Sequence, residues 1–147
     1  MAATILVVGF LGMIQAITIG TQMMDTAQKQ TLATQIAQAE IDRLRYSAWT
    51  SISTLPTSAP FPTITIDSSG TAQGTAPDLA WFGLTNNATL RSAAKGYTCK
   101  LSATDNQGIN AGLRRITCTV TWSSPLGQSL TRSLTGYFSD GGYKFAY

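Results

Sequence analysis

Histidine is absent from this chain of 147 residues, and charged residues are scarce. Without histidine the chain cannot build a histidine-dependent catalytic triad or a zinc–histidine site, because it lacks the commonest general base and the commonest metal ligand. Asp, Glu, Lys and Arg make up 12% of the residues, about half the usual share in a soluble globular protein. A disordered chain combines low hydrophobicity with high charge, so the composition excludes global disorder. The net charge of +3 is too small to indicate nucleic acid as a partner.

Signatures of catalysis are missing as well. The sequence has no paired carboxylates, no glycine-rich phosphate loop and no nucleophile beside an activating base. The segment from Asp105 to Asn110 holds oxygen ligands, but it lacks EF-hand spacing and has one carboxylate, so we expect an ordinary turn. Arg114 and Arg115 begin a predicted strand, where one of the two side chains is expected to point to solvent. A solvated pair is favoured, with contact to an anion or DNA as the alternative. We therefore expect no enzymatic activity, no catalytic residue, no cofactor and no metal site.

The first 24 residues, Met1–Met24, contain no charge and are mostly apolar. As a helix they would span about 36 Å, which exceeds the roughly 30 Å hydrocarbon core of a bilayer. A secretory signal peptide is one alternative, but the basic n-region and a small-residue cleavage site are missing. A buried core helix is another, but the uncharged run is long for one. A hydrophobic tail that resides in a membrane or packs against other helices is favoured.

The helical pattern continues beyond the first charged residue. From Asp25 to Ala48 there is no glycine or proline, and good helix formers dominate. Apolar residues recur at spacings of three and four, which makes one stripe: Leu32, Ala33, Ile36, Ala37, Ile41, Leu44 and Ala48. We predict one continuous helix over residues 2–48, apolar over 1–24 and amphipathic over 25–48. Three glycines in the first half either weaken the helix or permit close helix packing: Gly9, Gly12 and Gly20.

The remaining residues, 49–147, are predicted to form a connector and a β-sheet, and we call them the head. Proline, serine and threonine dominate residues 50–77, where Thr63–Ile66 indicates a short edge strand. Residues 77–96 are expected to supply core side chains under a loop: Leu79, Trp81, Phe82 and Leu84. Alternating apolar and Thr/Ser residues after Tyr97 predict three antiparallel strands, with a short fourth over Tyr143–Tyr147.

The sheet has one apolar face, which indicates that it covers something on that side only. The partner available is the amphipathic half of the helix. We therefore predict an α+β fold, in which the long N-terminal helix packs against a small C-terminal antiparallel sheet. The expected helix–sheet core consists of Leu32, Ile36, Ile41, Leu44, Trp122, Leu130 and Leu134.

The second hairpin of the sheet has a predictable register. Directly opposed residues share a face, so apolar residues should meet apolar residues. A turn centred on Leu126 puts Trp122 opposite Leu130 and Cys118 opposite Leu134, whereas a turn between Pro125 and Leu126 mixes the faces. The favoured register needs an odd loop, and Pro125 and Gly127 suit one of three residues. We expect Trp122 to face the helix near Ile41 and Leu44.

The two cysteines, Cys99 and Cys118, lie at core-facing positions of two neighbouring predicted strands. If they face each other, the hairpin midpoint falls between Gly108 and Ile109, inside a segment rich in turn residues. This coincidence favours a disulfide, which would indicate an oxidising compartment. Two free buried cysteines are the alternative. The pair lacks Cys-x-x-Cys spacing, so redox activity is not expected.

A helix that is first hydrophobic and then amphipathic, followed by a small sheet with a disulfide, resembles the type IV pilin superfamily. The resemblance rests on the apolar run Ala2–Ile19 and on residues 31–45, which end in the Glu-x-x-Arg-Leu-Arg stretch Glu40–Arg45. The strand Thr119–Trp122 also fits. The first 48 residues match the family pattern well and the sheet matches it in architecture only. Minor pilins and type II secretion pseudopilins are the most similar kinds.

One position departs from the family pattern. Mature pilins usually have Glu at the fifth position, where this sequence has Ile5, and the leader with its glycine before the cleavage point is absent. Either this subunit lacks that Glu, or the chain starts several residues inside the helix. The second reading is favoured, because the apolar run then sits in the expected frame.

The resemblance implies a structural subunit of a type IV pilus-like filament of a bacterium. Such a subunit waits in the inner membrane, in contact with lipid and the assembly machinery. It then joins copies of itself in a helical filament at the cell surface or in the periplasm. Major pilin, minor pilin and pseudopilin all remain open. The residues expected to pack helix against helix in the filament are Ile5, Leu6, Val8, Gly9, Phe10, Leu11, Gly12, Met13, Ile14, Ile17 and Ile19.

A different class of function is the main alternative. The chain would then be a single-span, membrane-anchored module that binds DNA or an adhesion ligand and does not polymerise. The composition makes nucleic acid the weaker of those two ligands.

Overall fold

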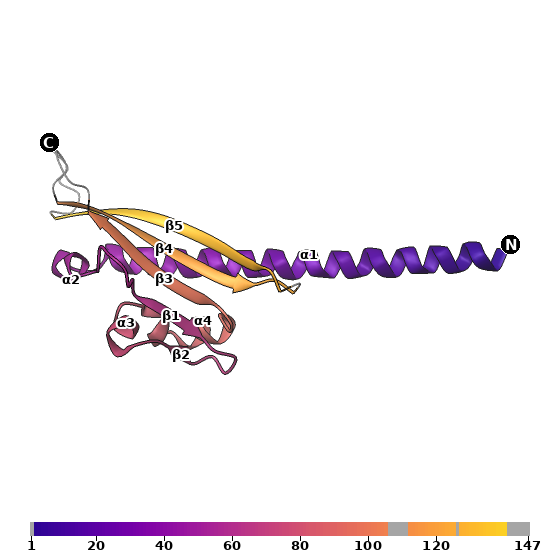
Figure 1. The fold of residues 1–147 in the computed structure, drawn as a ribbon, viewed down its shortest axis with the longest axis horizontal. Helices are drawn as coiled ribbons and strands as arrows, with labels where there is room; N and C mark the ends of the chain where they lie inside the picture. The colour runs from indigo at the N-terminus through magenta and orange to yellow at the C-terminus, as the bar shows by residue number, and fades with distance from the viewer. Residues whose placement is uncertain (1, 106–111, 126, 141–147) are drawn as a thin grey trace.

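A long helix runs along one side of an antiparallel sheet and extends well beyond it (Figure 1). The computed structural model describes residues 2–105, 112–125 and 127–140, with side chains for residue 7 and from residue 9 onward. The predicted α+β arrangement is confirmed: helix α1, Ala2–Arg45, packs against a five-stranded sheet. The fourth strand predicted at Tyr143–Tyr147 lies outside the described residues.

Helix α1 ends close to its predicted end. The amides of Tyr46 and Ser47 donate to the carbonyls of Arg43 and Leu44, 3.2 and 3.1 Å away, which tightens the last turn. Ala48 is extended, with φ −64° and ψ 145°, and a separate short helix, α2, follows over Trp49–Ser53. The sequence prediction extended the helix to residue 48, because no glycine or proline marks its end, and it did not include α2.

The sheet has the strand order β2-β1-β3-β4-β5, and all its pairs are antiparallel. Its long strands are β3 (Thr98–Asp105), β4 (Leu113–Ser123) and β5 (Ser129–Ser139). The predicted strand at Thr63–Ile66 is present as β1. Its expected place at the sheet edge is wrong, because the two-residue strand β2, Ala72–Gln73, pairs with its outer side.

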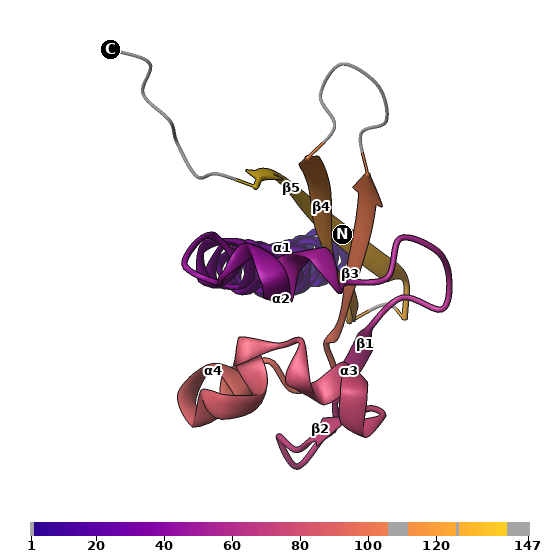
Figure 2. The same ribbon diagram turned by 90° about the vertical axis from the view of Figure 1, so that its left-hand side faces the viewer.

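Residues 76–93 form three short helices rather than a loop: α3 (Ala76–Ala80), η1 (Gly83–Asn86) and α4 (Ala88–Ala93). The side chains of Thr75 and Asn87 cap α3 and α4 by accepting hydrogen bonds from backbone amides. Phe82 and Leu84 are buried, as expected of core residues. Figure 2, which looks along α1, shows α1 and α4 on the same side of the sheet.

The core lies between this layer of helices and the inner face of the sheet. Of the predicted helix–sheet residues, Ile36, Ile41, Leu44 and Trp122 are buried. The others, Leu32, Leu130 and Leu134, are partly buried and pack against the same cluster.

The predicted register of the β4–β5 hairpin is confirmed. Trp122 lies opposite Leu130 and Cys118 opposite Leu134, with Val120 opposite Arg132 as the one mismatch. The hairpin closes where the amide of Ser124 donates to the carbonyl of Gln128, 2.8 Å away. Gly127 adopts φ +76°, a left-handed conformation that glycine reaches without strain. The loop therefore has the predicted odd length.

The expected neighbours of Trp122 on the helix are wrong. Its ring stacks on Tyr97, with centroids 5.9 Å apart, and the Tyr97 hydroxyl donates to the carbonyl of Lys29. Ile41 lies instead beside Gly136, near the other end of β5, where a Cβ on Gly136 would meet it at 3.1 Å. Strand β4 therefore runs antiparallel to α1, a direction that side-chain periodicity does not contain.

The predicted Cys99–Cys118 disulfide is also wrong, since both cysteines are free and buried. Cys99 lies opposite Val120, and Cys118 lies opposite Leu101. The two cysteines are thus diagonal neighbours, and such Cα atoms are typically about 7–8 Å apart. A disulfide needs roughly 4.4–6.8 Å. The pairing of β3 with β4 is offset from the prediction by two residues, which separates the sulfur atoms.

We predict that the protein contains two thiols that react slowly while it is folded. Burial, with a smaller contribution from Glu40, raises the pKa of the Cys99 thiol to about 12, and burial also raises the pKa of Cys118. At pH 8 both groups stay protonated, so alkylation should be at least about a hundredfold slower than in the unfolded chain. Mass spectrometry after iodoacetamide treatment measures this rate. An unreduced, unfolded chain that takes up no label would show that the disulfide exists after all.

Candidate functional site: an exposed apolar helix

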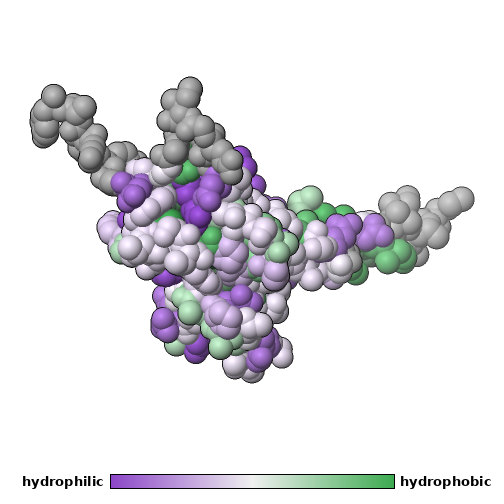
Figure 3. All heavy atoms as spheres, turned by 60° about the vertical axis from the view of Figure 1, so that its left-hand side comes forward, coloured by the Kyte–Doolittle hydropathy of each residue, from purple (hydrophilic) through white to green (hydrophobic). Residues whose placement is uncertain are grey.

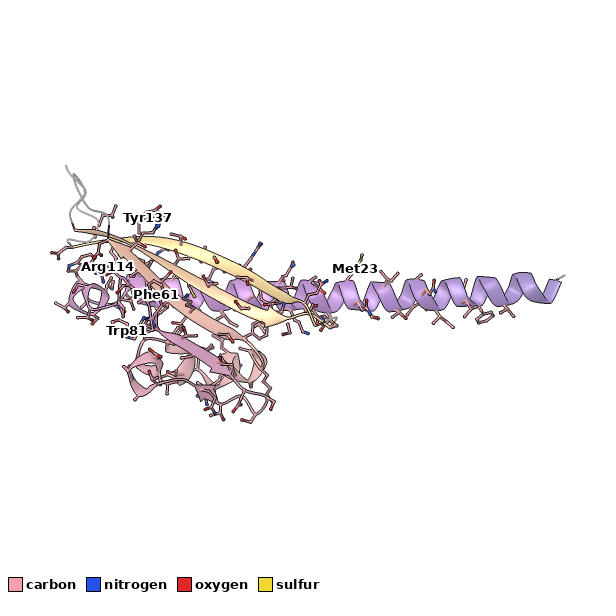
Figure 4. The ribbon with its side chains drawn as sticks, viewed as in Figure 1. Met23, Phe61, Trp81, Arg114 and Tyr137 are labelled. Atoms are coloured by element: carbon pink, nitrogen blue, oxygen red, sulfur yellow. The ribbon has the colours of Figure 1, made fainter. Side chains whose placement is uncertain are left out.

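The N-terminal half of α1 exposes large apolar side chains. Their exposed fractions lie between 54% and 69%: Val7, Phe10, Leu11, Met13, Ile14, Ile17, Ile19, Met23 and Met24. Met23 stands just beyond the tip of the β4–β5 hairpin (Figure 4), and green apolar surface covers much of the helix that leaves the head (Figure 3). A contiguous exposed apolar surface on this scale marks a contact with other molecules.

The predicted packing residues divide into two groups. Ile5, Leu6 and Val8 lie outside the residues whose side chains the structure describes. Those from Gly9 to Ile19 all lie on the exposed part of α1. A Cβ built on Gly9, Gly12 or Gly20 would meet nothing within 4 Å, so space is open there for close approach of another helix.

Membrane-crossing helices need both length and a strongly apolar character. Within the described residues, no helix combines the two to the degree that crossing a bilayer requires. The predicted span at residues 1–24 includes positions outside the described side chains, and it stays a prediction.

A group of hydrogen bonds fixes the head on the second half of α1. The carboxylate of Glu40, 3% exposed, accepts hydrogen bonds from the backbone amides of Gly83 (3.0 Å) and Leu84 (2.6 Å). It also accepts from Nε of Arg43 at 3.0 Å, and Arg43 donates in addition to the carbonyl of Trp81. These four residues and Trp81, which we call the Glu40 clamp, fix the start of η1 on α1. A Cβ on Gly83 would overlap Cδ of Arg43, so any larger residue there would displace the arginine from its position in the clamp.

A second buried charge fixes α2 to the sheet (Figure 4). Arg114 forms two hydrogen bonds with the carboxylate of Asp105, and its Nη1 donates to the carbonyls of Ile52 (2.6 Å) and Leu55 (3.0 Å). The predicted solvated Arg114–Arg115 pair is therefore wrong for Arg114, which is 7% exposed. Arg115, by contrast, is exposed.

Sequence reasoning missed both buried charges, although each leaves a signal. Glu40 lies within the apolar stripe of α1, beside Ile36, Ala37 and Ile41. Arg114 occupies one of the alternating positions of β4 whose side chains face inward. A charge in an apolar phase indicates a buried group that needs several hydrogen-bond partners.

The described part of the chain offers little chemistry beyond packing. No group of three or more His, Cys, Asp or Glu residues within it could hold a metal ion. Asp67 has a carboxyl pKa below its usual range, because it accepts hydrogen bonds from Ser69, Thr71 and Gln73 in the β1–β2 turn. That carboxylate serves to close its own loop.

Comparisons with models of protein families, with curated proteins and with solved structures found no match. The surface geometry and the chemistry of its residues are therefore the basis for assigning a function.

We predict that Glu40→Ala destabilises the protein by about 3 kcal/mol, because it leaves the backbone amides of Gly83 and Leu84 and Nε of Arg43 without an acceptor. Asp42→Ala is the matched control. Asp42 also pairs with an arginine three residues ahead, at 3.1 Å, but both partners are exposed, so the cost should be about 0.5 kcal/mol or less. Urea unfolding followed by tryptophan fluorescence measures both. Equal losses of unfolding free energy in the two variants would show that the Glu40 clamp contributes little to stability.

Proposed function

We propose that this protein is a structural subunit of a type IV pilus-like filament and that α1 is its assembly element. The single observation that supports the proposal most is the all-round exposure of apolar side chains over residues 7–24, next to a half of the same helix that is packed on the head. A surface of this kind must be covered in use, either by lipid or by other helices. A parallel bundle of copies covers it on every side.

The physical basis of assembly would be helix packing rather than removal of apolar surface from water. Before assembly the same side chains would lie in the inner membrane, where lipid is already apolar, so van der Waals contact and small residues decide the outcome. Gly9, Gly12 and Gly20 provide the small positions. The packing residues predicted from the sequence, Ile5 to Ile19, would line these contacts.

The head would form the outer surface of the filament. On the outer face of the sheet, hydroxyl groups pair across strands, with oxygen distances of 3.0 Å for Thr117–Thr135, 3.1 Å for Thr119–Ser133 and 3.3 Å for Thr121–Thr131. Such a face is compatible with water. The Glu40 clamp would keep each head at a fixed position relative to its helix, which a regular filament needs.

We predict that cells with a type IV pilus-type assembly system display filaments built of this chain, and that Gly12→Leu reduces their yield at least tenfold. A Cβ at this position meets nothing within 4 Å, and leucine favours the helix by about 1 kcal/mol relative to glycine, so folding should be unaffected. It would obstruct a neighbouring helix. Electron micrographs and the amount of the 15.6 kDa chain in sheared surface fractions measure the yield.

Ala93→Leu is the control, because it adds the same side chain at an exposed position of the head; filament yield should not change. Recovery of the wild-type chain only in detergent extracts, with no filaments, would contradict the proposal. That result would favour the membrane-anchored binding module.

A further inference from the structure

Polar residues lie on different faces in the two halves of α1. Eighteen residues make about five turns of an α-helix, so residues eighteen apart lie on one face. Gln15, Thr18 and Gln22 therefore lie on the face that packs on the head five turns later, where their counterparts are the buried residues Ala33, Ile36 and Glu40. The head side of α1 is thus buried in its second half and carries these three polar residues in its first half, where the exposed apolar residue Leu11 lies beside them.

On the opposite face of α1, apolar residues come first and polar residues follow. Five turns after the exposed apolar residues Phe10, Met13 and Ile17 come Gln28, Thr31 and Gln35, and Gln38 follows Gly20 in the same way. We call the four polar residues Gln28, Thr31, Gln35 and Gln38 the α1 back. All four are exposed.

The side-chain amides of Gln15 and Gln22, in the first half of α1, have no hydrogen-bond partner within the described part of the subunit. The hydroxyls of Thr18 and Thr21 donate to the carbonyls of Ile14 and Thr18, each 2.9 Å away, as hydroxyls in apolar helices commonly do. Among the residues whose side chains are described, Gln15 and Gln22 have side chains that form no hydrogen bond. An amide buried in a helix bundle without a partner costs free energy, so a bundle must supply one.

The α1 back has the chemistry to supply it. No charged residue occurs between Lys29 and Glu40, whereas the solvent face of an ordinary helix is rich in charge. Amides and hydroxyls lose less than ionised groups when water is removed, provided that they find hydrogen-bond partners. The α1 back therefore suits burial against another polar, uncharged surface.

We infer that Gln15 and Gln22 of one copy form hydrogen bonds with the α1 back of a neighbouring copy, an inference that rests on the proposed filament. One helix of 44 residues does not bend back on itself, so the partner must be a second chain. With heads outside, the head side of each helix points outward and the α1 back points inward, so the two surfaces meet between staggered copies. The stagger is about 20 Å, since roughly fourteen residues at 1.5 Å each separate the surfaces.

Opposite charges at the two surfaces test this contact. Gln22→Glu alone and Gln35→Lys alone should each lower filament yield at least tenfold, because each buries an unpaired charge. Both new residues are good helix formers, and neither glutamine side chain forms a hydrogen bond within the described subunit that the substitution would break. Gln22→Glu combined with lysine at position 28, 35 or 38 should restore yield to within threefold of wild type in at least one pairing. Thr104→Glu, at an exposed position of β3, is the control and should assemble normally.

Each outcome of this experiment tests either the inferred contact or the proposed filament. Single variants that assemble like wild type, or a set of pairings of which none restores assembly, would overturn the inferred contact while leaving the filament intact. A wild-type chain that forms no filament would instead contradict the proposed function. Restored yield in a paired variant supports the contact, since a general folding defect would not be repaired by a second charge.

Discussion

The carboxylate of Glu40 joins the two parts of the molecule. It is buried on α1 and binds the backbone amides of Gly83 and Leu84, which belong to the start of η1. Arg43 shares the carboxylate and reaches the carbonyl of Trp81 from the other side. Because these are bonds to backbone groups, they fix the path of the chain over residues 81–84 and not merely a side-chain position. The core residues Phe82 and Leu84 depend on that path.

Once the head is fixed on the second half of α1, residues 9–21 of the helix stay exposed within the described subunit. Its first half exposes Phe10, Ile17 and their neighbours on all sides, and an unsupported apolar helix is stable in water only with a partner. Its second half exposes the α1 back, which consists of three glutamines and one threonine and carries no charge. Both surfaces belong to one helix, so a stack of parallel copies can cover them together. The filament proposal depends on this distribution and not on any catalytic or ligand-binding feature.

Sequence periodicity was sufficient to predict the long helix, the alternating strands and the β4–β5 register, because each of these depends on local chemistry. Pro125 and Gly127 define a short loop, and the facing apolar residues leave one register that keeps the faces separate. The register of β3 with β4 was predicted wrongly, because it does not depend on local chemistry alone. The segment between Asp105 and Arg114 is too long for turn chemistry to fix a midpoint, and a shift of two residues separated Cys99 from Cys118. The Asp105–Arg114 ion pair spans the end of that ladder and is a constraint that the apolar pattern does not contain.

The candidate surface was predictable in part. The uncharged run by itself indicates an exposed or membrane-associated helix, and residues 9–19 lie on it as expected. The Glu40 clamp was not predictable from the stripe alone, since its partners are backbone amides more than forty residues away. The placement of Gln15 and Gln22 on the head side of α1 also required the burial of Ala33, Ile36 and Glu40 to define which side faces the head.

Oxidative footprinting of surface filaments tests the central claim, that copies of this chain cover the first half of α1. Met13, Met23 and Met24 are 67–69% exposed in the subunit, and Tyr137 on the head is 65% exposed. In sheared filaments free of detergent, the account predicts that the three methionines oxidise at least about tenfold more slowly than in the unfolded chain, because packed helices exclude the oxidant. Tyr137 should be modified at close to its unfolded rate. Methionines that oxidise as fast as in the unfolded chain, in filaments where Tyr137 also reacts, would contradict the account.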